Sequence, residues 1–106
     1  MKKPPLESTI SKKIREYVFS RGGFAVKIKG GPDQEKGIPD NLCCYRGRFL
    51  GLETKRVTGE EPSPYQQYQL ERITKAGGIA SVIHSVEEAE AILDRVDEEL
   101  GGPSPS

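Results

Sequence analysis

The sequence predicts an α/β domain with a mixed four-stranded sheet, a three-strand antiparallel meander plus one parallel strand, and helices on both faces. Two apolar runs, 41–45 and 49–53, flank a short turn and indicate a hairpin, and the alternating run 24–29 supplies a strand before it. A strand, helix, strand order over 49–83 implies a right-handed crossover to a parallel neighbour. Both faces of the hairpin are apolar, so we expect helices to cover both.

The first helix is predicted over 6–20, because apolar residues recur there at helical spacing. Glu7 lies one turn before this apolar stripe and therefore close to its inward side. An acid in a first turn also matches the helix dipole, so a role in a site and an ordinary structural role are about equally supported.

The second half of the chain continues the pattern. Ser63 caps a second helix over 64–76, which a Gly-Gly pair ends. The run 79–83 is the fourth strand, and Ser85 caps a last helix over 86–100.

The length of 106 residues predicts one domain over 1–100, followed by a disordered Gly-, Pro- and Ser-rich tail, 101–106. No apolar run approaches the roughly 20 residues that span a bilayer, and no apolar signal core follows the basic N-terminus, so we expect an intracellular protein without a membrane partner. Cys43 and Cys44 are adjacent on a strand and point to opposite faces. We expect them to be reduced thiols rather than a disulfide or a zinc site.

Charge is unevenly distributed along a chain whose formal net charge is zero. Residues 1–56 hold 13 Lys and Arg against 6 Asp and Glu, and residues 57–106 hold 3 against 10. The basic half hints at a nucleic-acid partner, although a single acidic helix exposed for solubility would give the same asymmetry.

The charged residues that could form a site lie at one end of the predicted hairpin. A two-residue loop, Arg46-Gly47, places Asp40 opposite Glu53 on one face, and Lys55 follows two residues later on that face. A three-residue loop would send Asp40 to the other face. Taken alone, the pattern also fits an Asp that opens a strand beside an exposed Glu–Lys pair.

A long polar loop, Gly30 to Gly37, precedes this hairpin. It fits a mobile flap over a site and a solvated connection equally well. It lacks the Gly-x-x-x-x-Gly-Lys-Ser/Thr pattern of a nucleotide-binding loop.

Five motifs follow one another along the chain: Glu7, the Gly-x-Pro-Asp of 37–40, the strand and basic end of 49–56, the Ser-Pro-Tyr-Gln of 63–66, and the Ala-Gly-Gly turn of 76–78. In this order and spacing they resemble the motifs of the VRR-NUC family of the PD-(D/E)xK nuclease superfamily, particularly its small stand-alone phage domains. Thr54 departs from the aliphatic residue that is commoner at its position, and the loop 30–37 is idiosyncratic.

The resemblance implies a restriction-endonuclease-like core and a metal-dependent phosphodiesterase. Asp40 and Glu53 would bind Mg²⁺ or Mn²⁺, helped by the backbone carbonyl of Thr54 and by Glu7. Lys55 would orient the attacking water and stabilise charge on the scissile phosphate. Oxygen-rich ligands suit these two metals, and a bound metal both polarises a phosphate and acidifies a water. The same resemblance gives Gln66 a role in supporting the water or the lysine.

The resemblance further implies a homodimer that cuts branched DNA such as four-way junctions, in the cytoplasm of a bacterium or of a phage-infected host. Lys29, Arg48 and Arg56 are the candidate phosphate contacts, each of which also fits a solvated surface position. Two alternatives stay open: a flap, nick or single-strand nuclease with the same site, and a non-catalytic nuclease fold that binds DNA.

Overall fold

The computed structural model describes residues 6–57 and 59–103; the basic N-terminus and the last three residues of the predicted tail lie outside this part of the chain. Three helices and four strands form in the predicted order, with boundaries within two residues of those expected from the sequence. They are α1 (Glu7–Ser20), β1 (Phe24–Lys27), β2 (Asn41–Tyr45), β3 (Arg48–Thr54), α2 (Pro64–Lys75), β4 (Ile79–Ile83) and α3 (Val86–Glu99).

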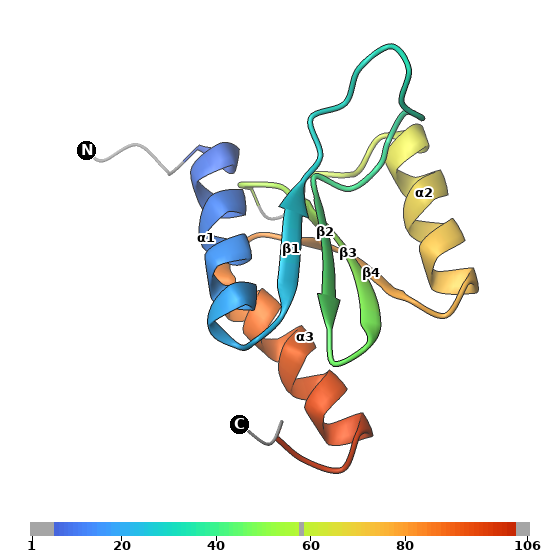
Figure 1. The fold of residues 1–106 in the computed structure, drawn as a ribbon. Helices are drawn as coiled ribbons and strands as arrows, with labels where there is room; N and C mark the ends of the chain where they lie inside the picture. Colours follow the sequence, from blue (N-terminus) through green and yellow to red (C-terminus); the bar gives the residue numbers. More distant parts are fainter. Residues whose placement is uncertain (1–5, 58, 104–106) are drawn as a thin grey trace.

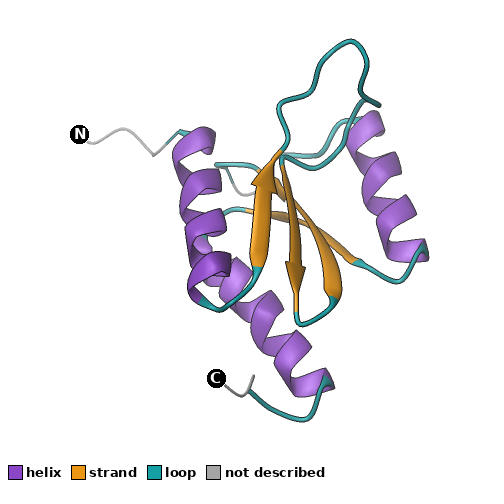
Figure 2. Cartoon of the chain, in the orientation of Figure 1, coloured by secondary structure: helices purple, strands orange, loops and turns teal. Residues whose placement is uncertain are grey.

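The four strands form one mixed sheet in the order β1-β2-β3-β4 (Figure 1). The first three strands pair antiparallel, and β4 pairs parallel to β3. Helices α1 and α3 lie on one face and α2 lies on the other (Figure 2), which confirms the predicted fold class. None of the described helices has the length and apolar character needed to cross a membrane.

The turn between β2 and β3 has the predicted two-residue form. Tyr45 pairs with Arg48, and both Arg46 (φ 51°) and Gly47 (φ 84°) have positive φ. A non-glycine residue seldom adopts this conformation. The Arg46 side chain compensates, because its Nη1 donates to Asp97 Oδ1 at 2.9 Å and to the carbonyl of Gly102 at 2.7 Å.

The hydrophobic core lies between the sheet and the α1/α3 pair. Buried positions of β2 alternate with less buried ones, as period two requires, whereas the last five residues of β3 are all buried because that strand is covered on both faces. The core side chains are those of Ile14, Val18, Ala25, Cys43, Tyr45, Leu50, Leu52, Ile83, Ala89, Ile92, Leu93 and Val96.

The opposite face is covered only in part, which corrects the expectation that helices cover both faces of the hairpin. Helix α2 packs on β3 and β4 and leaves the β1 and β2 side open. Phe24 is 57% exposed, Phe49 is 45% exposed, and the Cys44 thiol between them is also exposed. One short helix is too narrow to cover four strands, so apolar strand residues beyond its reach face solvent.

Candidate active site

Two carboxylates meet where β2 begins and β3 ends. The register that pairs Asn41 with Leu52 places Asp40 opposite Glu53, as predicted. The carboxyl group of Glu53 is hydrogen-bonded by the backbone N–H of Asp40. In return, the backbone N–H of Thr54 donates to Asp40 Oδ1 at 2.7 Å. Each acid is therefore held by the backbone of the other's strand.

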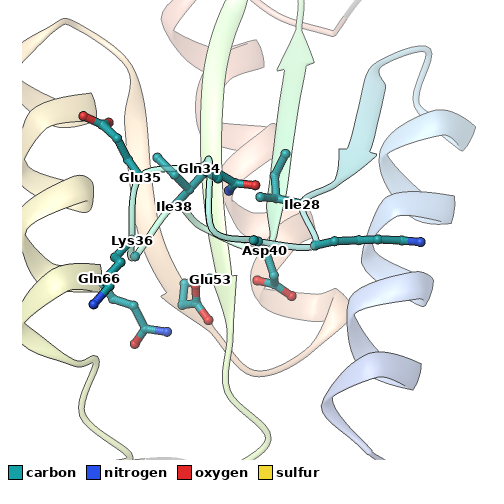
Figure 3. Close-up of a pocket in the computed structure, with 12 residues that line it drawn as sticks. Ile28, Gln34, Glu35, Lys36, Ile38, Asp40, Glu53 and Gln66 are labelled. Atoms are coloured by element: carbon teal, nitrogen blue, oxygen red, sulfur yellow. The ribbon is translucent and has the colours of Figure 1, made fainter.

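Both acids line a pocket of about 330 Å³. Its other walls are Gln66 from the first turn of α2 and residues of the segment 28–38. Figure 3 shows the carboxylates of Asp40 and Glu53 next to each other, with Gln66 and Lys36 on the α2 side. The pocket therefore combines acceptor oxygens with polar and cationic side chains.

The environment of Glu53 opposes its ionisation. The residue is only 6% exposed. Burial, followed by the charge of Asp40, raises the pKa of Glu53 from 4.5 to about 7, although the charge of Lys55 lowers it. A cation placed between the two acids would relieve both effects.

The donor set fits a hard divalent cation, because the two carboxylates supply oxygen ligands from one pocket and each charge disfavours the other. Across 6–57 and 59–103, however, no three His, Cys, Asp or Glu side chains are grouped closely enough to hold a metal ion. Asp40 and Glu53 are thus the two side chains that could hold it, and the carbonyl of Thr54 would be a backbone ligand.

Glu7 is placed nearby but is not brought into the pocket. It is the first residue of α1 and is half-buried. Its charge is the smallest of the contributions that shift the pKa of Glu53. A role of Glu7 as a metal ligand remains a prediction.

Lys55 and Gln66 both lie near the acids, although only Gln66 lines the pocket. Lys55 follows β3, where its N–H donates to the carbonyl of Ile83 at 3.0 Å, and its charge reaches Glu53. Gln66 lines the pocket and also completes a capping box, since its Oε1 accepts from the backbone N–H of Ser63 at 2.8 Å. The cap commits the amide oxygen of Gln66, so the amide nitrogen is the group available to a ligand.

The three candidate phosphate contacts lie in different places. Lys29 lines the pocket with the acids. Arg56 lines a separate pocket with Lys13 and His84, between α1 and the start of α3. Arg48 starts β3, about 17 Å along the strand from Glu53, and pairs with Glu99 at 2.5 Å. The structure therefore groups only Lys29 with the carboxylates.

A buried polar network supports the acids from the opposite face of the sheet. Asn41 is fully buried, and its Oδ1 accepts from Ser11 at 3.0 Å and from Arg15 at 2.7 Å. Its Nδ2 donates to Thr54 Oγ1 at 3.5 Å. This network ties α1 to the strand positions next to Asp40 and Glu53. Sequence reasoning missed it, although a polar residue at the head of an otherwise apolar strand was the available signal.

Solved structures of other proteins share this fold. A solved structure described as a VRR_NUC domain matches with a TM-score of 0.69 and 26% identity, over 82% of this chain and 92% of that one. A second, described as a VRR_NUC domain protein, has a TM-score of 0.71 and 17% identity over 94% and 93% of the two chains. The fold is that of VRR_NUC domains.

A third solved structure matches less closely than these two. It is Hjc of Archaeoglobus fulgidus, described as a Holliday junction resolvase from an archaeal hyperthermophile. Its TM-score is 0.55 at 17% identity, over 71% of this chain and 64% of that one, which shows likeness of fold. No protein-family model matches this sequence. A search of curated proteins likewise finds no match.

Proposed function

We propose that this protein is a metal-dependent, structure-selective endonuclease that hydrolyses phosphodiester bonds in branched DNA such as four-way junctions. The observation that carries the proposal is the pair Asp40 and Glu53, which line one pocket with the charge of Lys55 beside them. Phosphodiesters repel anionic nucleophiles. A site that hydrolyses them therefore needs acids that hold a cation, and a base or a cationic side chain that orients the attacking water.

Each side chain has a distinct task in this proposal. Asp40 and Glu53, with the Thr54 carbonyl, hold Mg²⁺ or Mn²⁺, which when bound neutralises phosphate oxygens and acidifies a water. Lys55 orients the attacking water and offsets charge on the phosphate. Gln66 donates from its amide nitrogen to the water or the phosphate. The bond from Thr54 N–H to Asp40 fixes the plane of that carboxylate before substrate arrives.

Branched DNA is the favoured substrate because one matching structure is described as a Holliday junction resolvase. The test is cleavage of a labelled four-way junction by purified protein with Mg²⁺ or Mn²⁺, beside linear duplex, flap and single-stranded DNA. We expect paired symmetric nicks in the junction. We expect Lys55→Ala and Asp40→Asn to lower the cleavage rate at least about 100-fold.

Other outcomes separate the alternatives. Cleavage of flaps or single strands alone would keep the site chemistry and contradict the junction substrate. DNA binding by the folded protein without metal-dependent cleavage of any substrate would overturn the nuclease proposal and leave a non-catalytic binding module.

A homodimer belongs to the same proposal, since two symmetric nicks need two sites. The open part of the sheet supports it. Phe24, Val26, Cys44 and Phe49 share that face, and all are exposed and uncharged. Contiguous exposed apolar surface is a common feature of protein interfaces, and a chain of zero net charge does not repel its copy.

The dimer test compares Phe24→Glu with Tyr68→Glu by sedimentation. The two aromatic side chains are equally exposed, at 57% and 58%, but Tyr68 lies on α2, outside the open face. We expect a wild-type dimer that only Phe24→Glu converts to monomers. A monomeric wild-type protein, or equal effects of both changes, would contradict the assignment.

A further inference from the structure

The segment 28–38 builds most of the pocket wall, since nine of the twelve lining residues belong to it. It leaves β1 and returns to Asp40, and it contributes little to the core. Figure 3 shows Lys36 of this segment beside Gln66, across from the carboxylates. A polar wall of this kind contributes ligand contacts more than folding energy.

The segment is fastened to α2 by side-chain bonds. Arg72 Nη1 donates to Glu35 Oε2 at 2.8 Å, and Gln69 Nε2 donates to the carbonyl of Lys36 at 3.1 Å. The hydrogen bond and charge of Arg72 hold the pKa of Glu35 below its usual value. We call Glu35, Gln69 and Arg72 the latch. It holds the Glu35 side chain and the backbone carbonyl of Lys36 against α2.

Backbone packing fixes the segment a second time. Gly37 has φ 84°, and a Cβ added there would lie 2.3 Å from the carbonyl carbon and oxygen of Tyr65. Only glycine permits both this conformation and this approach. The segment therefore rests on the first turn of α2, one residue away from Gln66.

Lys36 is the cation that this arrangement holds at the pocket. Its Nζ lies 5.1 Å from the centre of the Tyr65 ring, a contact that orients the ammonium without neutralising it. Lys36 forms no ion pair within 6–57 and 59–103, although three acids, Glu35, Asp40 and Glu53, line the same pocket. An ammonium that is held in place and left uncompensated suits a phosphate oxygen.

We propose that Lys36 forms a phosphate subsite for the nucleic-acid strand beside the catalytic acids, and that the latch positions it. This inference rests on the proposed function, because it places a neighbouring phosphate of the same substrate. Lys36 would touch the substrate, whereas Glu35, Gln69 and Arg72 act through Lys36 as positioning residues.

The direct test measures junction binding by fluorescence anisotropy over a series of salt concentrations, in an Asp40→Asn background that prevents cleavage. We expect Lys36→Ala to weaken binding about tenfold and to reduce the slope of log affinity against log salt by about 0.9, the value for one lost phosphate contact. Lys36→Arg should retain most of the affinity. Lys75→Ala, at the far end of α2, is the matched control and should change neither quantity.

The direction in which DNA affinity changes tests whether the latch positions Lys36 or acts only through its charge. Glu35→Gln removes a negative charge near the pocket, so electrostatics alone predicts tighter DNA binding. The latch predicts weaker binding, and no further loss when Glu35→Gln is added to Lys36→Ala. Tighter binding in Glu35→Gln, or an equal loss in both backgrounds, would overturn the positioning role.

Failure of this inference differs from failure of the proposed function. Unchanged affinity and salt slope in Lys36→Ala, beside cleavage that Asp40→Asn abolishes, would overturn the subsite and leave the nuclease standing. A wild-type protein that cleaves nothing, together with weaker binding in Lys36→Ala, would overturn the nuclease and support the subsite.

Discussion

At the residue scale, Glu53 is the side chain whose ionisation the fold opposes and the proposed chemistry requires. Its folded pKa of about 7 lies above the ordinary 4.5, so the folded protein holds the proton more tightly than the unfolded chain. Stability from this group is fully present below about pH 4.5 and is lost as pH rises through 7. Without a metal, the folded protein is therefore destabilised by the carboxylate that its proposed chemistry needs.

Glu53→Gln should accordingly stabilise the metal-free protein at pH 8 and not at pH 5. A shift from 4.5 to about 7 sets an upper bound of about 3 kcal/mol on the gain. Urea unfolding of both proteins at the two pH values, with chelator present, measures it. The exposed change Glu71→Gln is the control. An equal difference between wild type and Glu53→Gln at both pH values would contradict the assignment.

The pairing of Asp40 with Glu53 was predictable because the length of a hairpin turn sets the register of its strands. Once the turn is Arg46-Gly47, antiparallel pairing places Asp40 against Glu53. Lys36 was not predictable in this way, because no periodicity governs a loop. Its place depends on contacts between Glu35 and Arg72, which are 37 positions apart in the sequence.

At the element scale, helix α2 packs closely against the sheet at Gly51 of β3. A Cβ at Gly51 would lie 2.6 Å from Cδ1 of Ile73 and 3.1 Å from Cγ of Pro39. Gly51→Ala should therefore cost about 1–3 kcal/mol of unfolding free energy. Ile73→Val removes the clashing Cδ1, so the double variant should regain much of this loss. Chemical denaturation of the single and double variants measures it, and strictly additive costs would contradict the close approach.

A second element-scale feature is the carboxylate that joins α3 to the rest of the fold. Asp97 is 8% exposed and accepts from Tyr45 Oη at 2.8 Å, Arg21 at 2.9 Å and Arg46 at 2.9 Å. Burial opposes its charge, but the hydrogen bonds from Arg46, Tyr45 and Arg21 outweigh it and hold the pKa of Asp97 below its usual value. It links the end of α1, the β2–β3 turn and α3.

Asp97→Asn should destabilise the protein more than Asp94→Asn, because Asp94 is exposed and shares only Arg21. The folded pKa of Asp97 is depressed, so its contribution is present above the usual value of 3.8 and is lost as pH falls through the folded value. Thermal denaturation at pH 7 and pH 3 checks both points. Equal effects of the two substitutions at pH 7 would contradict the role of Asp97, and cleavage at a permissive temperature should be unaffected.

The helices and strands were predictable from the sequence, whereas the extent to which α2 covers the sheet was not. Caps such as Ser63 and the apolar spacing in α1 are local signals, so helix and strand boundaries were predicted closely. How far α2 extends over the sheet depends on its packing against Gly51 and on its length. The open face around Phe24 and Phe49 is a tertiary outcome of that packing.

At the scale of the whole molecule, the site occupies one end of the sheet and the core lies on its α1/α3 side. The buried Asn41 network passes between these two regions and joins α1 to the strand ends that carry the acids. Acidic residues gather instead on α3, whose first turn contains Glu87 and Glu88. The molecule thus offers a divalent cation two kinds of acidic surface, a pair of carboxylates that line a pocket and an exposed helix.

The measurement that tests the central claim most directly is Mn²⁺ titration of the isotope-labelled protein, followed by paramagnetic broadening of its amide NMR signals. A cation held by the two acids should broaden the signals of Asp40, Glu53 and Thr54 first, at pH 8 more readily than at pH 6. Asp40→Asn and Glu53→Gln should abolish that early broadening. Broadening centred on Glu87 and Glu88, or unchanged in both variants, would contradict a metal site at the paired carboxylates.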